Sequence, residues 1–178
     1  MHRISYLFLL LLLSSNSHAE KLFWGISAIS QQVNQSSSSG LTATKDGTGL
    51  GIYADIYYQN KYRLNGTVSY VDYTNFFLTS ATASADYLMP INAQATFFIG
   101  ASAGAAGQVY SGGGIADSAF AGLYGVQTGA IMLLGNKLIL EAGYRLKFID
   151  LETEITDTMT IVTVDELNEI YLSLTILL

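Results

Sequence analysis

The chain has 178 residues, enough for one ordinary domain or for one small barrel if strands dominate. Hydrophobic residues make up 50% of it and charged residues 12%, about half the usual charged share, and the formal net charge is −6. This composition is too apolar for a disordered chain and poor in charge for a soluble one, and the acidic balance argues against nucleic acid as a partner. No run of about 18 apolar residues is present, so no membrane-spanning helix is expected. A closed barrel in lipid and an unusually apolar soluble β-protein remain as alternatives.

The first residues have the pattern of an export signal. Arg3 gives a short basic start, residues 6–13 (YLFLLLLL) form an apolar core of signal-peptide length, and residues 17–19 (SHA) supply small residues at the cleavage position. We therefore expect a cleaved signal peptide at residues 1–19 and one domain at residues 20–178. An uncleaved membrane anchor is the alternative, but the apolar core is too short to span a bilayer.

Cleavage after residue 19 would remove both histidines, His2 and His18, and the chain has no cysteine. A mature chain without these residues cannot build a disulfide framework, a thiolate site or a histidine-based metal site. No G-x-S-x-G motif is present either. We therefore expect no catalytic site, no cofactor and no metal, and we predict that the protein is not an enzyme.

The mature chain contains segments in which apolar and polar residues alternate. A tilted strand that crosses the bilayer in a barrel needs about 9–11 residues with lipid-facing and lumen-facing side chains in alternation. The segment at 138–150 is the clearest, with Glu141 and Arg145 on its polar face, and the alanine-rich segment at 76–88 is the poorest. Eight candidate strands follow this pattern: 21–33, 47–58, 61–73, 76–88, 91–107, 119–134, 138–150 and 167–178.

The connections between these segments alternate in length. Short turns are expected at 59–60, 89–92 and 135–137, where the residues favour tight hairpins. Longer polar connections are expected at 34–46, 72–75, 108–118 and 151–166. Short periplasmic turns and longer extracellular loops are typical of outer-membrane barrels. Aromatic residues near both ends of the strands suggest girdles at the two membrane interfaces, although aromatic residues also favour strands in general. For the turn end we expect Trp24, Tyr57, Tyr58, Tyr62 and Tyr87, and for the loop end Tyr70, Tyr73, Phe76, Phe77 and Phe148.

The alternation also places charged residues on the polar face. A charge at the lipid midplane costs roughly 2–4 kcal/mol in a barrel, so this face must be the lumen. Acids and bases there are expected to pair, because a lone buried charge is costly. We predict a structural polar network that fills the lumen, with a proton or ion path as the alternative. Its members are Asp55, Arg63, Glu141, Arg145 and Glu169.

Several stretches resemble small bacterial outer-membrane β-barrels, the group that includes the OmpA-like transmembrane domain and the OmpX and opacity-protein types. These are residues 86–91 (DYLMPI), 97–104 (FFIGASAG), 125–130 (GVQTGA) and 140–145 (LEAGYR). The resemblance implies an all-β, eight-stranded antiparallel up-and-down transmembrane barrel in the outer membrane of a Gram-negative envelope. It implies outer-membrane lipid, lipopolysaccharide and the barrel-assembly machinery as partners. The chain departs from the pattern at Leu178, where such barrels usually carry an aromatic residue.

Two functions follow as expectations. The first is a structural or surface-interaction (adhesion) barrel, whose loops contact a host or envelope ligand. The acidic, threonine-rich loop at 151–166 could bind divalent cations or basic partners, or it could simply be a solvated loop. The second function is a narrow channel for small or apolar molecules, suggested by inward glycines such as Gly125 and Gly129. Some similar barrels modify lipid A, but they use histidine, which the mature chain would lack.

Overall fold

A computed structural model describes residues 21–37, 40, 42–59, 61–110, 117–135, 137–155 and 160–177. The predicted signal peptide at residues 1–19 lies outside this range. In the described part of the chain, no helix is long and apolar enough to cross a membrane. The described strands are β1 (Lys21–Ser37), β2 (Thr42–Tyr58), β3 (Tyr62–Asp72), β4 (Phe76–Pro90), β5 (Ala95–Tyr110), β6 (Asp117–Leu134), β7 (Leu138–Ile155) and β8 (Thr160–Leu177).

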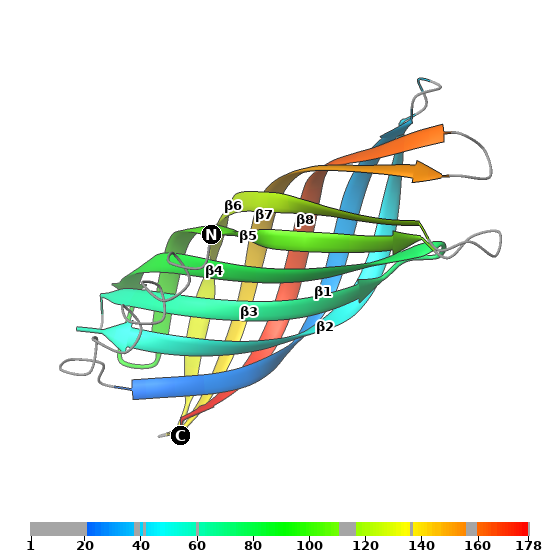
Figure 1. The fold of residues 1–178 in the computed structure, drawn as a ribbon. Coiled ribbons are helices and arrows are strands. Elements are labelled where there is room, and N and C mark those ends of the chain that lie inside the picture. The colour runs from blue at the N-terminus through cyan, green and yellow to red at the C-terminus, as the bar shows by residue number, and fades with distance from the viewer. Residues whose placement is uncertain are drawn as a thin grey trace, which may run out of the picture.

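The strands form a closed barrel in which each pairs antiparallel with its neighbours in sequence, and β1 pairs with β8 (Figure 1). Both described chain ends, at the start of β1 and the end of β8, lie at the end of the barrel that carries the short turns. The predicted fold class, an eight-stranded antiparallel up-and-down barrel, is confirmed.

The alternation along each strand separates an outer apolar face from an inner polar face. In β3, residues alternate strictly between exposed and buried, with Val68 64% exposed and Arg63 1% exposed. Leu50, Ile52 and Phe120 are also more than 60% exposed, whereas a soluble β-protein would bury such side chains. The apolar face therefore points outward, as it does in barrels that lie in lipid. The weak segment predicted at 76–88 follows the same rule, because alanines form the outer face of β4.

Several strands are longer than the sequence pattern predicted. The expected loops at 34–46 and 151–166 are largely strand. β1 continues to Ser37 and β2 already begins at Thr42, while β7 continues to Ile155 and β8 already begins at Thr160. The segment at 151–166 is rich in threonine, valine and isoleucine, which favour strands even without an apolar face. The segment at 34–46 contains no valine or isoleucine, and its strand residues pair with each other across the hairpin of β1 and β2. In contrast, residues 91–94 form a turn rather than the start of β5, and the Asn92 side chain accepts hydrogen bonds from the backbone N–H groups of Gln94 and Ala95.

The aromatic girdles need a correction. Trp24, Tyr62, Tyr87 and Tyr70 face outward and are 45–53% exposed, as expected. Tyr73 and Phe76 are instead buried, and Tyr57 packs edge-on against the inward Phe23 with 5.2 Å between ring centroids. Their distance from the strand end is that expected of a girdle. However, side chains alternate between the two faces of a strand, and these residues fall on the face that points into the lumen. Spacing from the strand ends alone does not distinguish the two faces.

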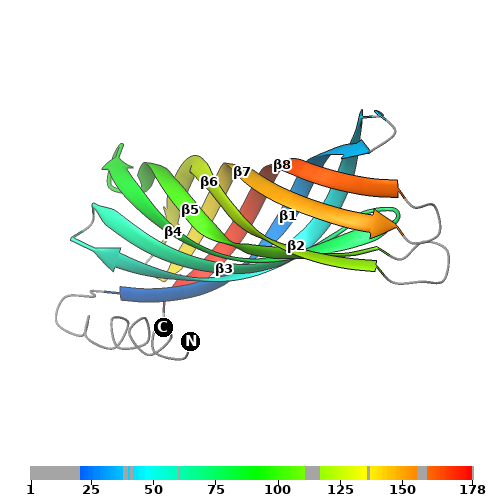
Figure 2. The same cartoon turned by 45° about the horizontal axis from the view of Figure 1, so that its top comes forward.

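The wall of the barrel parts toward the loop end. Pairing of β2 with β3 begins only at Thr48 and Asp72, and pairing of β6 with β7 ends at Leu123 and Ile149. Beyond these positions β7, β8, β1 and β2 continue as one four-stranded sheet, held by pairs that reach Ser36 with Thr42 and residue 155 with residue 160. Figures 1 and 2 show these blue and orange strand ends continuing together, apart from the green strands. We call this extension, residues 150–155, 160–164, 35–37 and 42–47, the upper sheet.

Candidate functional site

The lumen holds a guanidinium that contacts three carboxylates. Arg63 on β3 donates from Nε to Oδ2 of Asp86 on β4 at 2.8 Å, and from both terminal nitrogens to Glu141 on β7, with 3.2 Å between Nη2 and Oε1. Its Nη1 lies 3.8 Å from Oδ2 of Asp55 on β2. All four side chains are at most 2% exposed. The antiparallel register brings them together, because Arg63 pairs across the sheet with Asp86. We call these residues the Arg63 cluster.

A second ion cluster surrounds Glu169 on β8. Its Oε1 accepts from Nη1 of Arg145 at 2.6 Å, and its Oε2 accepts from Nζ of Lys147 at 2.7 Å. The same Oε2 accepts from the Gln31 amide at 2.8 Å. Arg145 and Lys147 are successive inward positions of β7, so both reach one carboxylate on the neighbouring strand. We call these residues the Glu169 cluster.

Two side chains join the clusters. Gln127 on β6 donates from Nε2 to Oδ1 of Asp86 at 2.6 Å and accepts from Nε of Arg145 at 3.3 Å. Tyr171 donates to Glu141 at 2.6 Å, and the Arg145 guanidinium lies 3.8 Å from the centre of its ring. The network is therefore continuous across the barrel.

All five predicted network residues meet in this network: Asp55, Arg63, Glu141, Arg145 and Glu169. The network also contains five residues beyond the predicted set: Asp86, Lys147, Gln127, Gln31 and Tyr171. Their inward direction could have been predicted from strand parity, because each of these residues lies an even number of positions from another inward polar residue on its strand. The prediction therefore missed two further charges, Asp86 and Lys147, and the uncharged polar side chains that connect the clusters.

The charges of the two clusters are unequal. One guanidinium faces three carboxylates in the Arg63 cluster, whereas two cations face one carboxylate in the Glu169 cluster. Because buried charges must be compensated, the acidic excess at one cluster and the basic excess at the other favour keeping both in contact through Gln127. Among the described residues, no group of three or more His, Cys, Asp or Glu side chains is placed to hold a metal ion.

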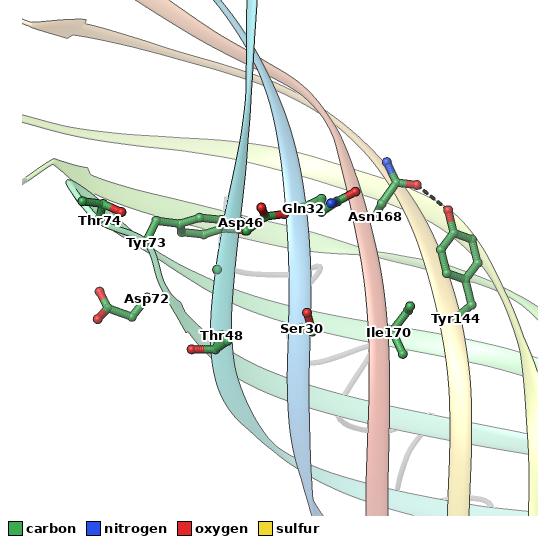
Figure 3. Close-up of a pocket in the computed structure, with 11 residues that line it drawn as sticks. Ser30, Gln32, Asp46, Thr48, Asp72, Tyr73, Thr74, Tyr144, Asn168 and Ile170 are labelled. Atoms are coloured by element: carbon green, nitrogen blue, oxygen red, sulfur yellow. Dashed lines mark hydrogen bonds between the residues drawn. The ribbon is translucent and has the colours of Figure 1, made fainter.

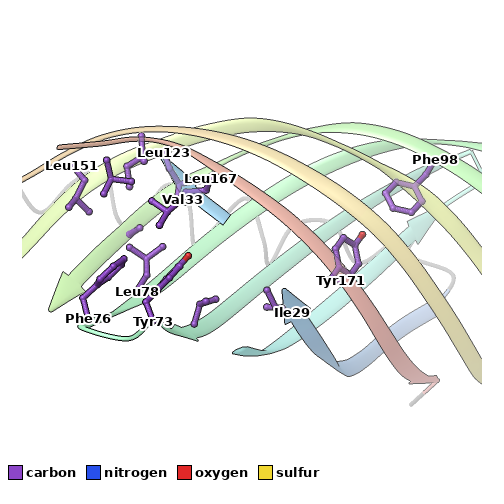
Figure 4. Packing of buried hydrophobic residues seen from close by; sticks show 14 of the residues in the cluster. Ile29, Val33, Tyr73, Phe76, Leu78, Phe98, Leu123, Leu151, Leu167 and Tyr171 are labelled. Atoms are coloured by element: carbon purple, nitrogen blue, oxygen red, sulfur yellow. The ribbon is translucent and has the colours of Figure 1, made fainter. Parts of the chain in front are cut away.

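Apolar layers bound the network on both sides. On the loop side, inward side chains that are at most 3% exposed pack together above the ion clusters (Figure 4). On the turn side, Phe98 lies under the Arg63 guanidinium, 4.5 Å from ring centre to Cζ. The loop-side layer consists of Val33, Val71, Phe76, Leu78, Leu123, Leu151, Val164 and Leu167, and the turn-side layer of Phe23, Leu88, Phe98, Ile131 and Ile139.

The inward glycines do not leave open space. A Cβ on Gly125 would lie 2.2 Å from the carbonyl oxygen of Leu146, and one on Gly129 would lie 2.4 Å from that of Ala142. Their small size allows close contact with the neighbouring strand. The narrow-channel hypothesis loses the observation that motivated it.

Tyr73 closes the lumen where β3 ends. Its ring stacks on Phe76 with 4.3 Å between centroids, and its hydroxyl donates to Oε1 of Gln31 at 2.6 Å. Gly47 lies against the ring face, since a Cβ there would be 2.6 Å from a ring carbon. Burial raises the pKa of the Tyr73 phenol, and the nearby carboxylates of Glu169 and Asp46 raise it further, so the hydroxyl remains a hydrogen-bond donor.

A groove lies on the outer wall at the level where the barrel parts. Its volume is about 700 Å³, and β1, β2, the end of β3, the connection from β3 to β4, β7 and β8 contribute to it (Figure 3). Tyr144 donates to Oδ1 of Asn168, whose amide donates to Glu166 at 2.6 Å. The sequence pattern does not predict this groove, since the groove depends on the register of strands distant in sequence. Its lining consists of Ser30, Gln32, Asp46, Gly47, Thr48, Asp72, Tyr73, Thr74, Tyr144, Asn168 and Ile170.

The closed eight-stranded barrel, apolar outside and polar within, has the architecture of a small transmembrane β-barrel. Among solved structures it is similar to Neisserial surface protein A (NspA), with a TM-score of 0.65 and 22% identity over 88% of this chain and 99% of that one. It is also similar to Ail, the attachment invasion locus protein of Yersinia pestis, in a complex with the heparin analogue sucrose octasulfate. That match has a TM-score of 0.52 and 14% identity over 89% of this chain and 99% of that one. No protein-family model matches the chain, and no curated protein sequence matches it. The predicted resemblance to small outer-membrane barrels is confirmed at the level of the fold.

Proposed function

We propose that this protein is an integral outer-membrane barrel with a side-chain-filled lumen that binds a partner at the cell surface through its upper sheet. Residues 1–19 direct export and are removed, and the barrel-assembly machinery inserts the remaining chain among outer-membrane lipids and lipopolysaccharide. The loop end faces outward and the short turns face the periplasm. The ion clusters hold the barrel rigid, and no residue acts as a catalyst.

The free edge of β2 is the observation that carries this proposal. Residues 42–47 pair with β1 on one side, and no described residue pairs with them on the other. Pairing between β2 and β3 begins only at Thr48 of β2, opposite Asp72 of β3. Residues 42–46 are exposed on both faces of the sheet. Such an edge presents unpaired backbone donors and acceptors at strand spacing, which an extended peptide can use as a template.

The side chains of this edge limit what can pair with it. Lys45 and Asp46 put a charge of each sign beside the free backbone, and charged residues on an edge oppose uncontrolled self-association. Thr42 and Thr44 precede them, and threonine is a residue type that favours paired strands. We therefore infer a partner that presents an extended segment with polar side chains, on a host cell or in the envelope.

Peptide selection against the reconstituted barrel tests the proposal. Extended peptides from a phage-displayed library should bind and should protect the backbone amides of residues 42–47 from hydrogen exchange. Replacing residues 35–44 with a two-residue turn removes Thr42, Ala43 and Thr44 from the edge and should weaken binding strongly. Shortening the hairpin of β5 and β6 by replacing residues 109–118 in the same way is the matched control and should leave binding intact. Equal binding by both shortened barrels, or failure to select any peptide, would refute strand addition at β2.

Planar-bilayer recordings separate this function from the channel. The filled lumen should give no discrete conductance steps, because the apolar layers exclude water on both sides of the ion clusters. Reproducible steps from barrels with correct heat-dependent gel mobility would favour a channel instead.

A further inference from the structure

The groove on the outer wall lies at the upper limit of the lipid-facing surface. On four neighbouring strands the outward side chains change from apolar to polar within two residues, from Ala28 to Ser30 on β1 and from Leu50 to Thr48 on β2. The same change runs from Tyr70 to Asp72 on β3 and from Ile170 to Asn168 on β8. Ser30 pairs with Thr48, and Thr48 pairs with Asp72, so these changes lie side by side. The groove therefore lies where the lipid chains of the outer leaflet end and the head groups begin.

The lining of the groove suits hydroxyl groups. Ser30, Thr48 and Thr74 offer hydroxyls, Gln32 and Asn168 offer amides, and all of these groups can both donate and accept hydrogen bonds. The described lining contains no lysine or arginine, while Asp46 and Asp72 add carboxylates. Carboxylates accept strong hydrogen bonds from hydroxyls and repel phosphate. An uncharged, hydroxyl-rich ligand fits this chemistry and an anionic one does not.

Internal contacts hold the groove in place before a ligand arrives. The hydrogen bonds from Tyr144 to Asn168 and from Asn168 to Glu166 fix one wall. Tyr73, stacked on Phe76 and anchored by Gln31, fixes the other wall and leaves Thr74 beside it, as Figure 3 shows. A prearranged site loses less conformational entropy on binding.

We propose that this groove binds the uncharged sugar head of a glycolipid in the outer leaflet. The continuity of its floor with the lipid-facing surface favours a lipid-linked sugar over a free one. Ile170, 65% exposed, lines the groove, and Leu50, 69% exposed, lies directly below it, so a sugar in the groove leaves its acyl chains against these residues. This site adjoins the free edge of β2 that carries the proposed surface function and shares Asp46 and Gly47 with it, and it requires the same orientation in the membrane.

Nuclear magnetic resonance of the barrel in lipid nanodiscs tests this inference. The probe is digalactosyl diacylglycerol, an uncharged glycolipid, titrated into phosphatidylcholine nanodiscs, with phosphatidylglycerol as the anionic lipid and methyl galactoside as the free sugar. The glycolipid should shift the side-chain amide signals of Gln32 and Asn168, and neither comparison compound should do so. Heat-dependent gel mobility establishes that each barrel has assembled, so a failure to bind is distinguishable from a failure to fold.

Two matched threonines locate the effect. Thr48→Val removes a hydroxyl from the groove, and Thr79→Val removes one from the outward face of β4, two strands away and outside the groove lining, where it donates to the Gly107 carbonyl. Loss of one hydrogen bond should weaken glycolipid binding about fivefold in Thr48→Val, and Thr79→Val should bind as the unaltered barrel does. Equal weakening in both variants, shifts with phosphatidylglycerol, equal shifts with free sugar, or no shift at all would each overturn the proposal. Residues 42–45 lie outside the groove lining, so protection of their amides by a peptide is read separately from glycolipid binding.

Discussion

The lumen is filled in two ways along its length, and the difference concerns how a narrow barrel is stabilised. In the middle, seven charged side chains and their polar neighbours form one hydrogen-bonded network. Toward the loops, the inward side chains are branched aliphatic residues and aromatic rings that pack as in a soluble core. The charged zone depends on each partner, because removing one leaves another charge buried and unpaired. The apolar zone depends on volume, and its cost of change should scale with the cavity left behind.

Removing the shared cation should have the largest effect. Arg63→Met leaves Asp55, Asp86 and Glu141 without their cation, and breaking a buried ion pair from one side costs about 3–5 kcal/mol. Urea unfolding in phospholipid vesicles, followed by heat-dependent gel mobility, measures the loss. Adding Glu141→Gln to Arg63→Met should recover part of it, since one uncompensated charge disappears. A double variant no more stable than the single one would contradict the charge argument.

Truncation in the apolar zone should have an intermediate effect. Leu167 is fully buried in the loop-side layer, and Leu167→Ala should cost about 2–4 kcal/mol through the cavity it opens. Leu172→Ala, five residues along the same strand but facing outward, is the control. Lipid can fill the space outside the barrel, so its cost should be clearly smaller in the same urea titration. Similar losses at both positions would mean that the loop-side layer is not packed as a core.

The comparison also explains how far the sequence predicts this molecule. Period-two alternation with charges confined to one face predicts the strands, their outward side and five of the seven charged residues of the ion clusters, because a charge in lipid is so costly. The loop-side layer could not be predicted in this way. Val33 and Leu167 are apolar although they point inward, so apolar and polar residues no longer alternate along these parts of the strands. The groove and the free edge of β2 depend on where β3 stops pairing, and residue type does not encode that register locally.

A smaller effect should follow at the border of the two zones. Tyr73→Phe keeps the stacked ring on Phe76 but removes the hydrogen bond to Gln31, which also binds Glu169. The expected loss is about 1 kcal/mol, the net value of one hydrogen bond. Differential urea stability against the unaltered barrel measures it. A loss as large as that of Arg63→Met would instead make Tyr73 a full member of the charged network.

An effect of similar size but opposite sign is expected at Gln108. Gln108 on β5 is 1% exposed beside the loop-side layer, and neither its amide nitrogen nor its amide oxygen has a partner among the described residues. A buried amide without partners costs free energy that an apolar side chain of similar length does not. Gln108→Met should therefore raise the free energy of unfolding by about 1 kcal/mol. Urea unfolding should show this as a higher midpoint with an unchanged slope. Gln127→Met, at an inward position on the next strand, should do the opposite, because its amide connects Asp86 with Arg145. The same substitution would then stabilise one zone of the lumen and destabilise the other, which is the sharpest form of the difference between them.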